Sequence, residues 1–150
     1  MNKKGVTLLE LIVVMVIIAI AAALAVPNIA AWLPNYRLRT ATRDIVSTMR
    51  TAQMKAVTTN VEYGVQFYPA DGTYITQHRT TAGLWVDDGD GVRQKIPSGI
   101  LFHEITLAGN RAEFNPNSTS TSGSVTLRNK RDTEKKIVLF PATGRIRVDE

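Results

Sequence analysis

The sequence predicts an α+β fold, in which one long N-terminal α-helix packs on an antiparallel β-sheet domain. Three observations predict this fold: an apolar run near the start, a helical repeat of apolar residues after it, and alternating apolar and polar residues over most of the remaining chain. With 150 residues, the chain has room for one domain beyond the apolar run.

The first predicted element is an apolar helix. Residues 11–26 contain no polar side chain, and residues 6–26 make a stretch of about 21 residues, or roughly 32 Å of helix. This length is sufficient to cross a bilayer. Lys3 and Lys4 precede the stretch, which predicts a cytoplasmic N-terminus and export of the remaining chain.

One carboxylate, Glu10, lies inside this apolar stretch. A charge at the centre of a membrane helix costs about 2.5–3.5 kcal/mol, so we expect Glu10 to have a partner. Two plainer interpretations remain: a single-span anchor with an incidental Glu near the membrane interface, and a secretory signal cleaved at a small-residue site such as Ala21-Ala22-Ala23.

We expect the helix to continue, from about Thr7 to Val57. Pro27 is expected to bend or open it, because the ring removes a backbone donor and clashes with the carbonyl four residues earlier, and Pro34 adds a second weak point. The second half has an apolar face with steps of three and four residues, which should pack on the sheet. This face consists of Leu38, Ala41, Ile45, Met49, Ala52 and Ala56.

The remaining chain is predicted to be mainly β. Residues 61–68 alternate apolar and polar side chains, residues 69–72 form a turn, and residues 73–79 resume the extended pattern, which together predict a hairpin. Residues 87–91 break the chain, and residues 115–123 form a polar loop. Further strands are predicted at residues 92–96, 100–107, 112–114, 124–127, 136–140 and 145–148.

Composition and spacing argue against several kinds of site. The chain has no cysteine, which excludes disulfides, thiolate metal sites and a cysteine nucleophile. His78 and His103 lack nearby ligand or catalytic partners at a suitable spacing, and no phosphate-binding or dinucleotide motif is present. The acidic loop 87–90 lacks the glutamate of a calcium-binding loop, so we interpret it as an ordinary solvated turn. We expect no enzymatic activity, no metal and no cofactor.

The segment Lys3-Lys4-Gly5-Val6-Thr7-Leu8-Leu9-Glu10 resembles the class III signal of type IV pilins and type II secretion pseudopilins. The resemblance implies cleavage by prepilin peptidase after Gly5, methylation of Val6, subunit docking through Glu10 and a helix kink at Pro27. Val6 departs from the family, which most often has Phe there. The implied division is a leader (residues 1–5), a transmembrane and filament-core helix (residues 6–26) and an extracytoplasmic domain (residues 27–150), helical to about residue 57 and then β-sheet.

Charge pairing gives a physical reason for this docking. The free amine of Val6 in one subunit is a cation that neutralises Glu10 of a neighbour inside an apolar filament core. Both charges are costly alone in hydrocarbon and attract strongly there, so the pair favours assembled subunits. The expected partners are prepilin peptidase, other pilins or pseudopilins and inner-membrane lipid. The expected location is the bacterial inner membrane, with the C-terminal domain in the periplasm and the chain assembled into a pilus or pseudopilus.

The whole pattern resembles the GspH/FimT-like family of minor pseudopilins and minor pilins, in which an N-terminal helix packs on β-sheets. The resemblance depends on the turn Gly72-Thr73-Tyr74, the loop 87–91 and the ending Thr143-Gly144-Arg145-Ile146-Arg147. It implies a pilin-like fold. It also implies that the chain is a structural subunit, either the H-type pseudopilin of a type II secretion system or its counterpart in a type IV pilus.

The C-terminal ending supports an alternative function. In the FimT branch, a Gly-Arg-x-Arg ending is associated with DNA capture, and the resemblance carries this role to Arg145 and Arg147. On a strand these two side chains project on one face, about 7 Å apart, where guanidinium groups suit phosphate oxygens. Lys130 and Arg131 extend the patch if the fold brings them near, whereas Asp149 reduces its charge.

The helix beyond Pro27 also has a basic face, with Asp44 as its one acidic residue. We expect its cations to be solvated, or to contact lipid headgroups, acidic surfaces of adjacent subunits or nucleic acid. The basic residues are Arg37, Arg39, Arg43, Arg50 and Lys55.

Overall fold

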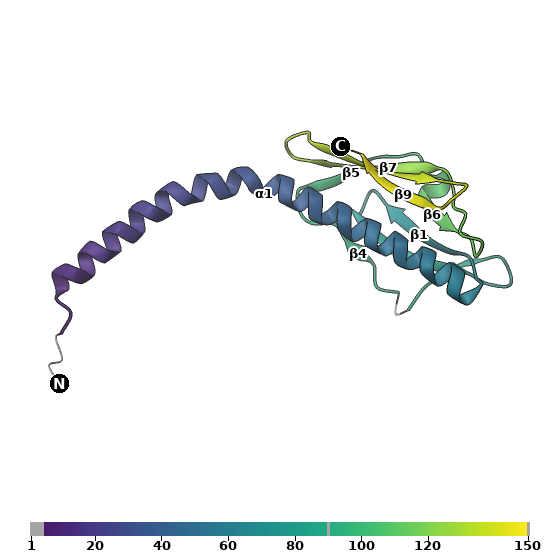
Figure 1. The fold of residues 1–150 in the computed structure, drawn as a ribbon, viewed down its shortest axis with the longest axis horizontal. Helices are drawn as coiled ribbons and strands as arrows, with labels where there is room; N and C mark the ends of the chain where they lie inside the picture. Colours follow the sequence, from purple (N-terminus) through teal and green to yellow (C-terminus); the bar gives the residue numbers. More distant parts are fainter. Residues whose placement is uncertain (1–4, 90, 150) are drawn as a thin grey trace. The chain divides into compact units, whose positions relative to one another are not determined.

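The computed structural model describes residues 5–89 and 91–149, and for residues 25–30 it describes the backbone alone. The chain divides into two compact units between Leu33 and Pro34. Helix α1 (Leu8–Thr59) runs through both units, and all the strands belong to the second unit (Figure 1). The predicted long helix is confirmed, with bounds within two residues of those expected.

The first unit contains the N-terminal part of α1. The large apolar side chains between Leu11 and Ile20 are each 47–63% exposed. Helical backbone continues through Pro27, and the bend expected there stays a prediction. Within the described ranges, no helix is both long enough and apolar enough to cross a membrane.

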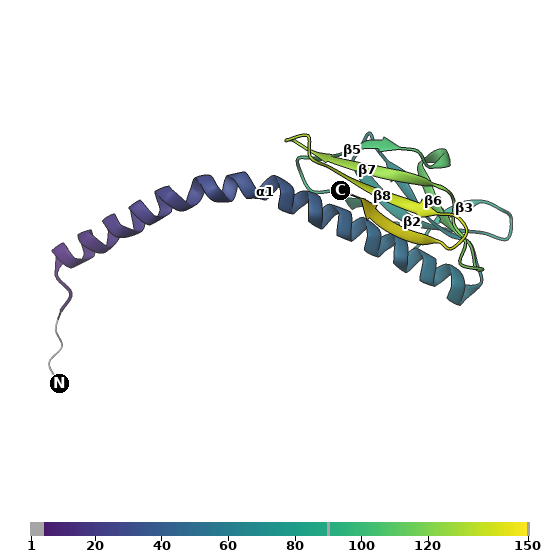
Figure 2. The ribbon, with the colours of Figure 1, turned by 45° about the horizontal axis from the view of Figure 1, so that its top comes forward.

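The second unit contains two antiparallel sheets (Figures 1 and 2). The first sheet has the strand order β3-β2-β1-β6, with β4 also paired to β2, and the second has the order β5-β7-β8-β9. The first sheet comprises β1 (Tyr63–Tyr68), β2 (Thr73–Arg79), β3 (Trp85–Asp87), β4 (Gln94–Lys95) and β6 (Arg111–Phe114). The second comprises β5 (Ile100–Ile105), β7 (Gly123–Asn129), β8 (Glu134–Phe140) and β9 (Arg145–Asp149), and a short 3-10 helix η1 (Ala108–Asn110) precedes β6.

The predicted hairpin is confirmed as β1 and β2. Tyr68 pairs with Thr73, so residues 69–72 form the turn, and Gly72 adopts a φ of 63°. Two other segments differ from the prediction. Strand β3 was not expected, and β4 is shorter than the predicted strand 92–96, because Gly91 turns the chain before it and Ile96 instead donates a backbone hydrogen bond to Gly72.

One hydrophobic core joins the second half of α1 to both sheets. Every residue of the predicted helical face, from Leu38 to Ala56, is at most 1% exposed, so this prediction is confirmed. The rings of Phe67 on β1 and Phe102 on β5 pack edge to face, with centroids 5.6 Å apart, which connects the two sheets. Burying each large apolar side chain contributes about 1.5–3 kcal/mol, so this shared core is the main stabilising feature.

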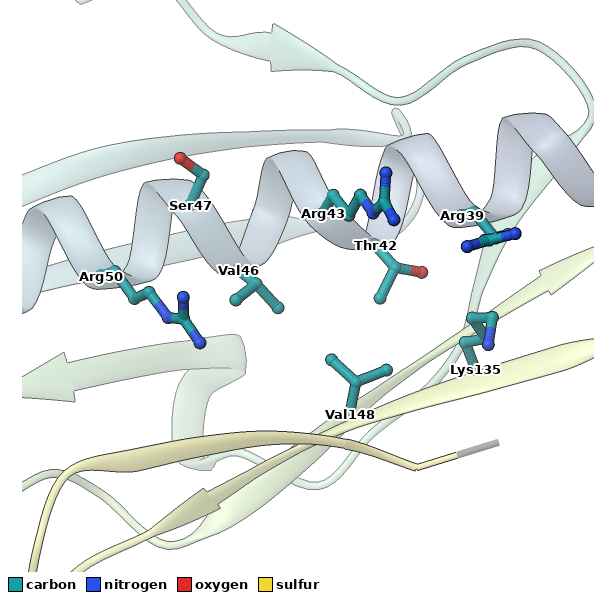
Figure 3. A pocket seen from close by; sticks show the side chains of 8 residues that line it. All are labelled: Arg39, Thr42, Arg43, Val46, Ser47, Arg50, Lys135 and Val148. Carbon is teal, nitrogen blue, oxygen red and sulfur yellow. The ribbon is translucent and has the colours of Figure 1, made fainter.

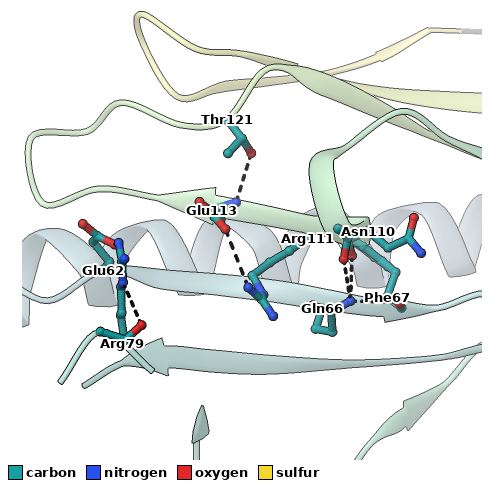
Figure 4. Close-up of polar contacts among 10 residues, drawn as sticks. Glu62, Gln66, Phe67, Arg79, Asn110, Arg111, Glu113 and Thr121 are labelled. Carbon is teal, nitrogen blue, oxygen red and sulfur yellow. Dashed lines mark hydrogen bonds and ion pairs between the residues drawn. The ribbon is translucent and has the colours of Figure 1, made fainter. Parts of the chain in front are cut away.

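Polar contacts surround the core on the first sheet (Figure 4). Arg79 pairs with Glu62 at 2.7 Å, and the backbone N–H of Glu113 donates to the hydroxyl of Thr121 at 3.1 Å. The second contact connects the polar loop 115–123 to β6. The amide of Gln66 donates to the carbonyl of Gly109 at 2.9 Å, which holds η1 beside β1.

Three side-chain contacts tie α1 to the end of β7 and to two loops of the second unit. The amide of Asn129 donates to Asn35 at 2.8 Å, and Arg37 donates to the carbonyl of Ser98 at 3.1 Å. The amide of Gln53 donates to the carbonyl of Gly144 at 3.2 Å. Arg37, which the sequence placed on a basic face, therefore contributes to holding the fold together.

Candidate functional site

The N-terminus of α1 is capped by Thr7. The hydroxyl of Thr7 accepts a hydrogen bond from the backbone N–H of Glu10 at 3.2 Å, and its carbonyl accepts one from Leu11 at 3.2 Å. Thr7 is thus the N-cap residue, with a glutamate three positions later, which is the sequence pattern of a capping box. Sequence reasoning missed the N-cap role of Thr7, although the pattern Thr-x-x-Glu was readable.

The predicted cleavage site lies just outside the helix. Gly5, Val6 and Thr7 precede α1 and have no regular secondary structure. Val6 is 73% exposed, and a Cβ atom added to Gly5 would meet nothing within 4 Å. An exposed segment next to a helix end is accessible to a peptidase.

Glu10 lies on an exposed and otherwise apolar surface. Its neighbours Leu9 and Leu11 are 73% and 60% exposed. The carboxylate is also in the first turn of the helix, where the helix dipole favours a negative charge. This position lets Glu10 accept hydrogen bonds from a cation that approaches the apolar surface.

The acidic loop is tied to α1 and β2, in contrast to the solvated turn that we expected. Lys55 pairs with Asp88, whose side chain is 18% exposed, and Gln77 donates to Asp87 at 2.8 Å. The hydrogen bond to Asp88 raises the pKa of Lys55 above its ordinary value. Asp90 lies outside the described residues. In the part of the chain that the structure describes, no group of three or more acidic or histidine side chains is arranged to hold a metal.

The two histidines contact charged side chains. His78 lies 3.8 Å from Asp88, with its ring 5.7 Å from that of Tyr63. His103 lies 2.6 Å from the guanidinium of Arg128 and 3.5 Å from Glu134. The contact of His78 joins β2 to the residue that follows β3, and those of His103 join β5 to β7 and β8.

Arg145 and Arg147 lie on β9, and both are exposed on the face opposite Ile146, which packs against the core. The guanidinium of Arg147 contacts both carboxylate oxygens of Asp149, at 2.6 and 2.8 Å, and this contact raises the pKa of Arg147. The same group lies 5.3 Å from the ring centre of Phe140. Asp149 therefore lowers the positive charge of this ending, as the sequence indicates.

The structure does not bring all four C-terminal basic residues together. Lys130 and Arg131 lie in the turn between β7 and β8, whereas Arg145 pairs with Phe140 at the other end of β8. The length of β8 separates these positions by roughly 20 Å along the strand. Of the helix cations, Lys55 pairs with Asp88, and Arg39, Arg43 and Arg50 line a groove beside β9.

Comparison with known proteins gives a family and a fold. The prokaryotic N-terminal methylation motif matches residues 1–26, and the type II transport protein GspH matches residues 41–144. No curated protein matches the sequence.

Two kinds of solved structure share the fold. The minor pseudopilin EpsH from the type 2 secretion system of Vibrio cholerae has a TM-score of 0.63 and 11% sequence identity, with 75% of this chain and 96% of EpsH covered. The type IV minor pilin FimU of Pseudomonas aeruginosa PAO1 has a TM-score of 0.61 and 13% identity, with 77% of this chain and 90% of FimU covered.

The family match covers more than half of the chain, and the structural likeness confirms the predicted pilin-like fold. The chain therefore belongs to the GspH family of type II transport proteins, carries the prokaryotic N-terminal methylation motif, and has the fold of a minor pseudopilin and of a minor pilin.

Proposed function

We propose that the chain is cleaved by prepilin peptidase after Gly5, methylated at Val6, held in the inner membrane by residues 6–26 and then built into a filament through Glu10. Its role is structural: the helix forms part of the filament core, and the periplasmic β domain contributes to the filament surface. The observation that carries the proposal is a single carboxylate in the first turn of an exposed apolar helix, directly after an accessible cleavage site.

The apolar surface of α1 supports burial of this helix in lipid or in a filament. The large apolar side chains between Leu8 and Ile20 are all more than 45% exposed in the single chain. A helix that is apolar on every side is stable when lipid or other helices surround it, because exposure of so much apolar surface to water is unfavourable.

The position of Glu10 supports its role in docking. Cleavage after Gly5 creates a cationic amine on Val6, one residue before the N-cap Thr7. In an apolar core, the carboxylate of one subunit and the amine of the next lower each other's desolvation cost by pairing. Because each subunit has one such pair of charges, the pairing also fixes the axial register between neighbours.

Replacement of Glu10 tests this proposal. We expect Glu10→Gln to retain leader removal but to lower the amount of the chain in sheared filaments by at least about tenfold, since breaking a buried ion pair costs about 3–5 kcal/mol. Glu10→Asp, which keeps the charge, is the matched control and should retain more assembly. Equal assembly of the wild type and Glu10→Gln would contradict the docking role.

DNA capture through Arg145 and Arg147 is the second candidate function. The contact between Arg147 and Asp149 gives Arg147 a partner within its own strand, which favours a structural role for this side chain. We therefore rank filament assembly first.

A further inference from the structure

A groove separates the second half of α1 from the end of the second sheet. Its volume is about 490 Å³. Figure 3 shows Thr42 and Val46 pointing from α1 towards Val148, with Arg50 at one end and Arg39 at the other. The lining residues are Arg39, Thr42, Arg43, Val46, Ser47, Arg50, Lys135 and Val148.

The rim of this groove is strongly basic. Arg39, Arg43 and Arg50 follow one another along α1, and none of them forms an ion pair with another described residue. No carboxylate is among the described lining residues. Arg39 and Arg43 are four residues apart on the helix and repel each other, so an anion that binds between them removes an unfavourable interaction.

The floor of the groove is partly apolar. Val148 is 40% exposed, and Val46 is partly buried against the core. Val148 belongs to β9, an edge strand of its sheet. Among the described residues, β8 is the one strand that pairs with β9. At the start of β9, Gln53 binds the carbonyl of Gly144 and fixes that end of the strand to α1. A floor of this kind suits an occupant that also has apolar groups.

The geometry fits an extended peptide. Arg39 and Arg50 are separated by about 16 Å along the helix axis, which an extended segment covers with about five residues. In such a segment, alternate side chains point to opposite sides, about 7 Å apart on each side, so that carboxylates can reach the arginines while apolar side chains reach the floor.

We propose that this groove binds an extended acidic segment of a neighbouring filament subunit. The carboxylates of that segment bind Arg39, Arg43 and Arg50, and its apolar side chains contact Val46 and Val148. The inference rests on the proposed function, since it requires a filament in which this subunit has neighbours, and it identifies the chemistry of one contact.

Peptide binding to the full chain in a neutral detergent tests the inference. The probe is a fluorescent, end-blocked peptide of alternating glutamate and valine, and its partner control has glutamine in place of glutamate. We expect saturable binding of the glutamate peptide by fluorescence anisotropy, with an affinity that falls as salt rises. Arg43→Gln/Arg50→Gln should weaken this binding at least about tenfold, because each arginine contributes charge-assisted hydrogen bonds.

Two further variants separate this site from general attraction by positive charge. The single variant Arg43→Gln removes one cation from the groove and should weaken peptide binding. Lys95→Gln, its matched control, removes one exposed cation on β4 and should bind the peptide within about twofold of the wild type. Val148→Trp fills the floor without changing charge and should weaken binding. Thermal unfolding verifies that each variant is folded. If Val148→Trp does not fold, the arginine variants alone decide whether the groove binds the peptide.

Three outcomes would overturn the inference: no binding of the glutamate peptide, equal binding by the wild type and Arg43→Gln/Arg50→Gln, or binding of a DNA oligonucleotide through these arginines without peptide binding. If any of these occurs while Glu10→Gln still lowers assembly as expected, the groove assignment fails and the proposed function stands. If the peptide binds as expected and Glu10→Gln assembles normally, the docking proposal fails instead.

Discussion

The backbone N–H of Glu10 donates a hydrogen bond to the hydroxyl of Thr7, with 3.2 Å between the two heavy atoms. This contact makes Thr7 the N-cap of α1 and places Glu10 in its first turn. After cleavage at Gly5, the new amine of Val6 would lie directly before the cap, near the positive end of the helix dipole. A carboxylate in the first turn also interacts favourably with this positive end of the helix, so the position of Glu10 in α1 is compatible with its proposed docking role.

Removal of the Thr7 hydroxyl should loosen the beginning of α1. Thr7→Ala leaves the N–H of Glu10 without its acceptor, at a cost of about 0.5–2 kcal/mol in helix stability. We expect faster amide hydrogen exchange at Glu10 and Leu11, whose N–H groups donate to Thr7, in the full chain in micelles. Thr7→Ser retains the hydroxyl and should exchange at nearly the wild-type rate, whereas equal exchange in all three proteins would contradict the capping role.

The ion pair between Lys55 and Asp88 should stabilise the second unit in a pH-dependent way. Lys55→Met is expected to lower the free energy of unfolding by about 1 kcal/mol at neutral pH, because the partly exposed pair is lost and Asp88 keeps a charge without its partner. The hydrogen bond to Asp88 raises the pKa of Lys55 in the folded state. The stabilisation is therefore complete at neutral pH and is lost as the pH rises through this raised pKa.

Denaturant unfolding of the wild type and Lys55→Met from neutral to strongly alkaline pH checks this prediction. The difference between the two proteins should shrink as Lys55 loses its proton. A difference that stays constant over the whole range would show that the ion pair is not its source.

Gly144 should tolerate no side chain. It has a φ of 57°, and an added Cβ would clash with the Ser118 carbonyl oxygen and the Gln53 amide. Gly109 has a φ of 60° with open space around it, so Gly109→Ala is a matched control that isolates the backbone cost of about 1–2 kcal/mol. We expect Gly144→Ala to lower the unfolding free energy by more than Gly109→Ala does, and equal losses would refute the clash.

The DNA-capture alternative predicts a specific salt-dependent interaction. We expect no such DNA site, because Asp149 already pairs with Arg147. The full chain with Arg145→Ala/Arg147→Ala should therefore retard duplex DNA in a gel at least as strongly as the Lys95→Gln control does. Retardation by the wild type that falls with salt and disappears in the double arginine variant would instead establish these residues as a DNA site.

Local patterns predicted the parts of the fold that local physics determines. The apolar face from Leu38 to Ala56 was readable because helical neighbours recur every three or four residues, and its burial follows from that repeat. The hairpin was readable because alternation on both sides of residues 69–72 is interrupted by a turn that ends in Gly72.

Contacts between distant segments were not readable from these patterns. Phe67 on β1 and Phe102 on β5 both pack in the core, yet their strands belong to different sheets, and alternation along a strand contains no information on its pairing partner. For the same reason, the sequence did not indicate that Lys130 and Arg145 lie at opposite ends of β8, or that Val148 faces Val46 across a basic groove. The tie between Asp88 and Lys55 was missed because the two residues are far apart in sequence.

The most direct test of the central claim is the intact mass of the native protein purified from membranes of its host. The account predicts a chain that begins at Val6 and carries one added methyl group on its terminal amine. A chain that begins at Met1, or one cleaved within residues 19–25 so that it lacks Glu10 and the apolar helix, would contradict it.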